Sequence, residues 1–182
     1  MKATGIVRRI DDLGRVVVPK EIRRTLRIRE GDPLEIFTDR EGEIILKKYS
    51  PIGELGQFAK QYADSLTQTT GHIVVITDKD QFIAVAGPTK KDLLTKSISR
   101  ELEEAINERE TVVASKEDKN YIRIMNEDDS EFVCQAVTPI ISEGDAIGAV
   151  IFLTKDAKAK FGELEVKLAS AAANFMGRQM EQ

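Results

Sequence analysis

A run of arginines and lysines between Arg8 and Arg29 is the part of this sequence best suited to a chemical task. It holds eight basic residues against three acidic ones, whereas the whole 182-residue chain has a net charge of −4. Guanidinium and ammonium groups gathered in this way bind polyanions, of which DNA is the commonest. The run therefore predicts a DNA-binding surface, and a solvated charged face is the alternative interpretation.

The spacing within this run predicts a short helix with one basic face. Pro19 suits the first helical position, because proline lacks the N–H that would stay unpaired there. At about 100° per residue, four basic residues share one arc of this helix, and Ile22 and Leu26 lie opposite as expected anchors. The basic arc consists of Lys20, Arg23, Arg24 and Arg27.

Short strands are expected on both sides of this helix, from apolar alternation and β-branched residues between turn residues. In the first strand, Arg8 and Arg9 would point to opposite faces. A unit of about 50 residues has little room for a core, so we expect it to oligomerise. The expected strands cover residues 2–10, 16–18, 34–38 and 43–48.

The first 49 residues also carry the pattern of a known family. G-I-V-R at 5–8, L-G-R-V-V-V-P at 13–19, R-R-T-L at 23–26 and L-E-I-F at 34–37 resemble the N-terminal domain of the AbrB-type bacterial transition-state regulators. This resemblance implies an all-β, swapped-hairpin barrel (AbrB-like) formed by two interleaved chains. It also implies that the homodimer binds double-stranded DNA.

The same resemblance implies which side chains contact DNA. Because most protein contacts to DNA go to the backbone, we expect phosphate contacts and at most one arginine bidentate to guanine. Few base contacts predict a preference for a deformable, AT-rich site. The family's DNA-contacting arginines match Arg8, Arg15, Arg23 and Arg24, and we expect Lys2, Arg9, Lys20 and Arg27 as secondary contacts.

The composition changes near residues 49–53. Residues 1–50 have a net charge of +3 and the remaining residues a net charge of −7, which argues against a second DNA-binding unit. We therefore predict two domains, residues 1–50 and 51–182.

The second domain is expected to be an α+β fold. The order of its elements resembles a GAF or PAS-like sensor domain, which implies an antiparallel sheet flanked by helices. Helices are predicted at 52–68, 93–109 and 161–180, and strands at 72–76, 81–86, 111–114, 132–140 and 146–154.

The GAF-like resemblance implies an unknown small-molecule effector, bound between the sheet and the loops at 87–92 and 115–131. The chain lacks the N-K-F-D-E signature of cyclic-nucleotide GAF domains. The apolar spacing of the last helix would also suit packing against a second copy, which would give a homotetramer. Ligand sensing and pure oligomerisation remain alternatives at this point. The residues with this spacing are Phe161, Leu164, Leu168, Ala172 and Phe175.

No catalytic constellation is recognisable, and we expect neither an enzyme nor a cofactor or metal. His72 is the only histidine and Cys134 the only cysteine, so one chain has no disulfide and no Cys/His zinc site. We expect His72 to be a polar residue at a strand edge and Cys134 a small buried apolar residue. The acids at 127–129 lack the spacing of a calcium loop.

A cytoplasmic, nucleoid-associated protein without a membrane partner is expected, since no signal peptide is recognisable and the longest apolar run, 146–153, is short. The combination of the two resemblances is similar to regulators of sporulation genes, whether activator or repressor. The alternative is an antitoxin-like or scaffold protein whose second domain only binds other proteins, because related barrels occur in antitoxins.

Overall fold

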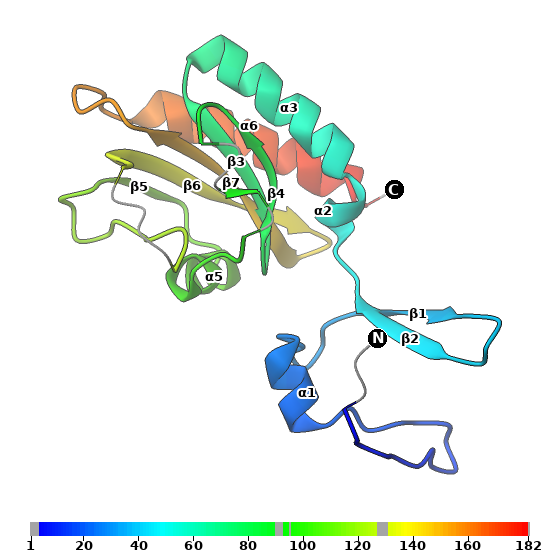
Figure 1. The fold of residues 1–182 in the computed structure, drawn as a ribbon. Helices are drawn as coiled ribbons and strands as arrows, with labels where there is room; N and C mark the ends of the chain where they lie inside the picture. Colours follow the sequence, from blue (N-terminus) through cyan, green and yellow to red (C-terminus); the bar gives the residue numbers. More distant parts are fainter. Residues whose placement is uncertain (1–3, 90–92, 95, 127–130, 182) are drawn as a thin grey trace. The chain divides into compact units, whose positions relative to one another are not determined.

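The computed structural model describes residues 4–89, 93–94, 96–126 and 131–181. The chain divides into two compact units, Met1–Tyr49 and Ser50–Gln182 (Figure 1). They are called unit 1 and unit 2 below.

Unit 1 contains one short helix and one hairpin. Helix α1 is Lys20–Thr25, and strands β1 (Leu34–Thr38) and β2 (Ile44–Lys48) pair in antiparallel register with Ile36 opposite Leu46. The Asp39 carboxylate closes the hairpin turn by accepting the backbone N–H groups of Glu41 and Glu43 at 3.0 and 2.9 Å. The predicted helix and the predicted hairpin are thus present.

The two other strands predicted in unit 1 differ from the structure. Residues 4–10 and 16–18 lie outside every helix and strand of the described chain. Only a turn joins them, in which the Asp11 N–H donates to the Arg15 carbonyl at 3.0 Å. A strand needs a partner for its backbone groups, and the single chain provides none for these segments.

Unit 2 is built on a five-stranded antiparallel sheet of order β4-β3-β7-β6-β5 (Figure 1). Apolar side chains are buried on both of its faces, which explains why the central strands read as nearly continuous apolar runs. The strands are β3 (Ile73–Asp78), β4 (Phe82–Ala86), β5 (Val112–Ser115), β6 (Cys134–Ser142) and β7 (Asp145–Thr154).

Helices cover both faces of this sheet. Helix α2 (Pro51–Glu54), helix α3 (Gly56–Thr70) and helix α6 (Glu163–Gln179) pack on one face, and helix α5 (Arg100–Asn107) packs on the other. The three predicted helical regions therefore all contain helix, with two corrections.

The first predicted helix, 52–68, is broken at Leu55, which ends α2 before α3 begins. Glycine weakens a helix, and Gly53 and Gly56 flank this break. Within the predicted helix 93–109, Leu93 is helical, but α5 begins only at Arg100. Before it, Ile98 pairs with Met125 in a β-bridge, and the Ser99 side chain caps α5 by accepting the Leu102 N–H at 3.0 Å. A long-range pairing thus interrupts the predicted helix.

Helix α6 lies against the backbone of the sheet at Gly177. A methyl group on this residue would lie 2.0 Å from the carbonyl oxygen of Ile141 in β6. The glycine therefore permits the contact between α6 and the sheet that buries Ala172, Ala173 and Met176.

We predict that Gly177→Ala lowers the free energy of unfolding by about 1–3 kcal/mol or more, since α6 must move away from β6. Gly56→Ala is the control, because its added methyl would meet only Ile83 Cγ2 at 3.9 Å. This control should be neutral or slightly stabilising. Urea unfolding followed by circular dichroism, at one protein concentration, measures both. Equal midpoints for the two variants would contradict the packing described here.

Candidate nucleic-acid interface

The turn at residues 11–15 holds one of the predicted DNA-contacting arginines in place. Asp11 Oδ1 accepts the backbone N–H groups of Leu13 and Arg15 at 3.0 and 2.7 Å. Its other oxygen, Oδ2, accepts Arg15 Nε–H at 2.8 Å. Gly14 adopts the positive φ of 76° that this turn requires.

The electrostatic consequence appears at the Asp11 carboxyl. The hydrogen bonds from the Arg15 backbone and side chain, with a smaller one from the Leu13 N–H, lower the pKa of Asp11. The carboxylate therefore keeps its charge, and its hydrogen bonds to Arg15, to a more acidic pH than an ordinary aspartate does.

Helix α1 presents two further arginines to solvent. Arg23 and Arg24 are exposed, and neither guanidinium has a hydrogen-bond or ion-pair partner among the described residues. The helix is short. Pro19 is its N-cap residue and not its first helical residue, so the helix begins one residue later than predicted, at Lys20. Ile22 is half-buried, but Leu26 is exposed in the single chain, so only one of the two predicted anchors is covered.

The helical arc predicted for the basic residues is wrong at Arg27. Helix α1 ends at Thr25, and Arg27 adopts a left-handed conformation with φ of 52°. Its carbonyl oxygen accepts Lys48 Nζ at 2.9 Å, which ties the residue after the helix to the end of β2. Arg27 therefore lies beyond the helix and not on its basic stripe.

An ion pair strengthens this connection. Lys48 Nζ lies 3.2 Å from Asp32 Oδ2, which also accepts the Arg29 N–H at 2.8 Å. Burial raises the pKa of Asp32, but the Arg29 hydrogen bond and Lys48 together outweigh it, and the net pKa is lowered. The exit of α1 is thus fixed to the hairpin.

The side chains of Arg8, Arg9 and Lys20 have no hydrogen-bond or ion-pair partner among the described residues. Arg8 and Arg9 are exposed in the segment before the turn, Lys20 is exposed at the start of α1, and Lys2 lies outside the described residues. Sequence reasoning missed Asp11, Asp32 and Lys48 as supports. For Asp11 a signal existed, since opposite charges four residues apart across a D-x-x-G turn favour such a pair.

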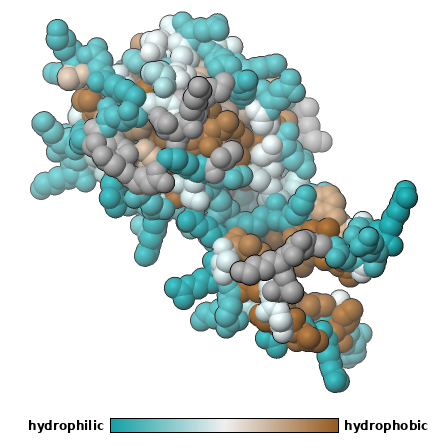
Figure 2. Space-filling view, in the orientation of Figure 1, coloured by the Kyte–Doolittle hydropathy of each residue, from teal (hydrophilic) through white to brown (hydrophobic). Residues whose placement is uncertain are grey.

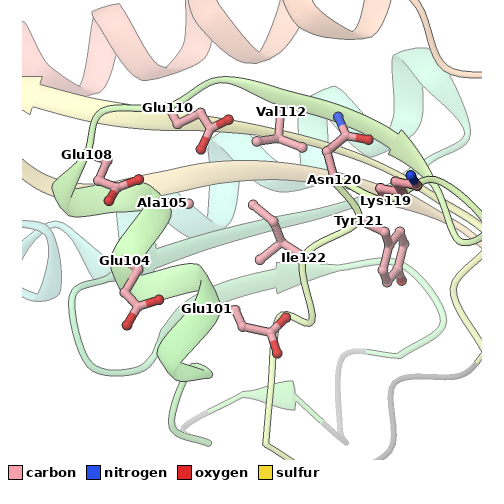
Figure 3. Close-up of a pocket in the computed structure, with 10 residues that line it drawn as sticks. All are labelled: Glu101, Glu104, Ala105, Glu108, Glu110, Val112, Lys119, Asn120, Tyr121 and Ile122. Atoms are coloured by element: carbon pink, nitrogen blue, oxygen red, sulfur yellow. The ribbon is translucent and has the colours of Figure 1, made fainter.

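Unit 2 has a surface hollow of about 260 Å³ between α5 and the segment at 119–122 (Figure 3). Ala105, Val112 and Ile122 contribute apolar surface to it. Four glutamates also line it: Glu101, Glu104, Glu108 and Glu110. The hollow includes part of the predicted 115–131 loop region, but none of residues 87–89, and residues 90–92 lie outside the described part of the chain.

The remaining candidate residues have structural surroundings. Cys134 is buried, as expected, with Sγ 3.3 Å from the Ala159 carbonyl oxygen. His72 Nε2 lies 3.5 Å from Glu165 Oε1, at the start of α6. The acids at 127–129 lie outside the described residues.

The described residues offer neither a metal site nor a membrane-spanning helix. They contain no group of three or more His, Cys, Asp or Glu side chains placed to hold a metal ion. Within the same part of the chain, no helix combines the length and apolar character that crossing a membrane demands.

Comparisons with known proteins agree with the division into two units. Residues 54–181 match the family model described as "Stage V sporulation protein T C-terminal, transcription factor". Residues 7–54 match a model described as "Antidote-toxin recognition MazE, bacterial antitoxin". Unit 1 is also similar to the transition state regulatory protein AbrB of Bacillus subtilis, with 67% identity over 51 residues, or 28% of this chain and 52% of that protein.

Among solved structures, unit 2 resembles the cofactor-binding GAF domain of the nutrient sensor CodY from Clostridium difficile. The TM-score is 0.51 at 15% identity, covering 71% of this chain and 92% of that one. At this identity the likeness establishes the fold alone, so unit 2 has a GAF-like fold.

One relative is similar throughout. Stage V sporulation protein T of Bacillus subtilis is 59% identical over 182 residues, which is 100% of both chains. With the family model matched over most of unit 2, this chain belongs to the stage V sporulation protein T family of transcription factors.

Proposed function

We propose that unit 1 binds double-stranded DNA and that the chain regulates sporulation genes from the chromosome. The arrangement of Arg15, Arg23 and Arg24 is the observation that carries this proposal. One guanidinium is held by Asp11, and two are exposed on α1 without partners among the described residues. Arg8 completes the primary set, and Lys2, Arg9, Lys20 and Arg27 give secondary contacts.

A homodimer is the proposed DNA-binding form. Unit 1 exposes many large apolar side chains, which appear as brown surface over residues 4–49 (Figure 2). Such a surface is costly in water, and a second copy would cover it. These exposed apolar side chains of unit 1 are Ile6, Val7, Ile10, Leu13, Val16, Val17, Leu26, Ile36, Phe37, Ile44 and Leu46.

Interleaving of two chains would also complete the fold of unit 1. Residues 4–10 and 16–18 lack strand partners in the single chain, and a second copy could provide them. The result would be the swapped-hairpin barrel implied by the resemblance to AbrB. It would place two copies of each DNA-contacting arginine across a two-fold axis.

The salt dependence of DNA binding tests this arrangement. About six to eight phosphate contacts per dimer, according to whether Arg15 binds a phosphate or a base, predict a slope of log K against log salt between about −5 and −7. The double variant Arg23→Ala with Arg24→Ala removes four of them, so its slope should be shallower than the wild-type slope by about 3 to 4. Fluorescence anisotropy with a labelled duplex, over a salt series, measures both slopes.

The charge-matched control is Arg100→Ala with Arg123→Ala, which removes two exposed arginines of unit 2. This control should keep the wild-type slope. A wild-type slope shallower than about −3, or an unchanged slope in the Arg23 and Arg24 variant, would contradict the proposed interface.

We further propose that the GAF-like units join two dimers into a homotetramer. Phe58 and Tyr62 of α3 and Phe175 of α6 form an aromatic cluster with ring-centroid distances of 5.5–6.1 Å. Phe175 is 41% exposed, and Leu164 on the same helix is 64% exposed. Apolar side chains exposed on adjacent helices suit packing against a second copy.

Phe175→Glu should convert the tetramer into a dimer, because it places a charge in this contact. Asn174→Glu adds the same charge at the neighbouring exposed position of α6 and should leave the tetramer intact. Light scattering after size-exclusion chromatography gives the mass of each variant. A wild-type dimer, or a tetramer in Phe175→Glu, would contradict this assembly.

A small-molecule effector is the third part of the proposal, supported by the GAF-like fold. Four glutamates and one lysine, Lys119, line the hollow of unit 2, and this excess of negative charge disfavours an anionic effector such as a cyclic nucleotide. An effector would act by shifting the population of DNA-competent conformations.

We therefore expect a neutral or cationic metabolite that raises the melting temperature of the full chain also to change its affinity for DNA. Thermal-shift screening followed by anisotropy tests this. Metabolites that bind and leave DNA affinity unchanged would contradict the coupling.

The match of residues 7–54 to an antitoxin model favours a second candidate, a toxin-neutralising or scaffold protein. Against it, unit 2 is a folded domain with its own apolar core on both faces of a sheet. Co-purification of a small protein at a stoichiometric ratio, together with absence of DNA binding, would favour this candidate over the first.

A further inference from the structure

Asp11 organises the turn before the basic helix more completely than a surface carboxylate usually does. Its own N–H donates to the Arg15 carbonyl and its carbonyl accepts the Gly14 N–H, both at 3.0 Å. Its carboxylate accepts three more N–H groups, from Leu13, the Arg15 backbone and Arg15 Nε. Five hydrogen bonds therefore fix one aspartate and the arginine four residues later.

This network leaves a particular part of Arg15 available. Only Nε is engaged with Asp11, at 2.8 Å, and neither Nη group has a partner among the described residues. The two Nη groups of a guanidinium form the fork that binds guanine O6 and N7 as a bidentate pair. Arg15 is thus oriented while its terminal donors stay exposed.

Arg23 and Arg24 differ in this respect. They are exposed on α1 with no partner, in the part of the chain that the structure describes, to hold their guanidiniums. Flexible side chains of this kind suit phosphates, which accept a cation from many directions, whereas reading a base edge requires a fixed geometry.

We propose that Asp11 is a positioning residue that orients Arg15 to read a guanine edge, so that Arg15 determines sequence preference while the helical arginines grip phosphates. This inference rests on the proposed DNA-binding function. It assigns different roles to arginines that the family resemblance treats alike.

The proposal predicts that removing Asp11 changes DNA affinity in the direction opposite to that expected from charge alone. Asp11 is a negative charge on a surface that binds a polyanion, so simple electrostatics predicts that removing it strengthens DNA binding. If Asp11 instead orients Arg15, its removal must weaken binding to the preferred sequence. A variant of the neighbouring aspartate distinguishes the effect of removing a negative charge from the effect of losing the orientation of Arg15.

Asp12 supplies the matched control. It is exposed, adjacent to Asp11, and has no hydrogen-bond or ion-pair partner among the described residues. Asp12→Asn and Asp11→Asn make the same chemical change one residue apart. The asparagine in Asp11→Asn can still accept the two backbone N–H groups through its side-chain oxygen, which preserves the turn.

The experiment uses the full-length protein and two labelled duplexes. One is selected from a random library by the wild-type protein, and the other is a scrambled duplex of the same length and composition. Anisotropy gives the ratio of the two affinities for wild type, Asp11→Asn and Asp12→Asn at one salt concentration. Arg15→Lys is the second variant, which keeps the charge but loses both the Nε–H and the fork.

Asp11→Asn should reduce the affinity ratio by about fivefold or more, the lower range of what one bidentate arginine–guanine contact discriminates. Arg15→Lys should reduce it similarly, with little change in the salt slope. Asp12→Asn should keep the ratio and bind both duplexes somewhat more tightly.

The proposal is overturned if Asp11→Asn keeps the wild-type ratio, if it strengthens binding as Asp12→Asn does, or if the wild type shows no preference between the duplexes. Failure of the wild type to bind either duplex would instead refute the proposed function, so the two failures are distinguishable.

Discussion

The core of unit 1 is incomplete in a single chain, and the other properties of this unit depend on that constraint. Val7, Leu13 and Val17 are each at least 70% exposed, although burying each of them would contribute about 1.5–3 kcal/mol. A unit of 49 residues cannot fold back far enough to cover them, because small domains bury a low fraction of their surface. The same segments also lack strand partners, so apolar burial and backbone pairing are missing at the same places. Both are satisfied together if a second copy interleaves, which makes association part of folding and not a later step.

Unit 2 covers its apolar surface and pairs its strands within one chain. Its sheet is covered on both faces, and α6 approaches β6 so closely that only a glycine fits at residue 177. Among the described residues its exposed large apolar side chains are fewer: Leu94 in a turn, and Leu164 and Phe175 on α6. Such residues suit association between already folded units, which would be weaker and more adjustable than the interleaving of unit 1.

The sequence predicted those elements whose causes are local. Strand β1 was expected at 34–38 and has those bounds, because a β-branched and aromatic segment is followed directly by the Asp39 turn. Features that depend on distant residues were missed. The helix predicted over 93–109 is interrupted before Arg100 because Ile98 pairs with Met125, and Arg27 leaves the helical arc where Lys48 binds its carbonyl oxygen. The predicted sites follow the same rule: charge and spacing identified the basic surface, but not how Asp11 and Asp32 order it.

That ordering bears on how a protein with a net charge of −4 can recognise DNA selectively. Cations alone give affinity that depends on salt and hardly on sequence. Selectivity needs at least one donor group whose direction is set before binding, because the entropy of fixing a long side chain would otherwise reduce the discrimination it achieves. The acidic residues within the basic run therefore do more than lower its net positive charge. Asp11 slightly reduces the attraction to phosphate, but its hydrogen bond also orients the Arg15 guanidinium. Asp12, which has no hydrogen-bond or ion-pair partner among the described residues, provides only the first of these effects.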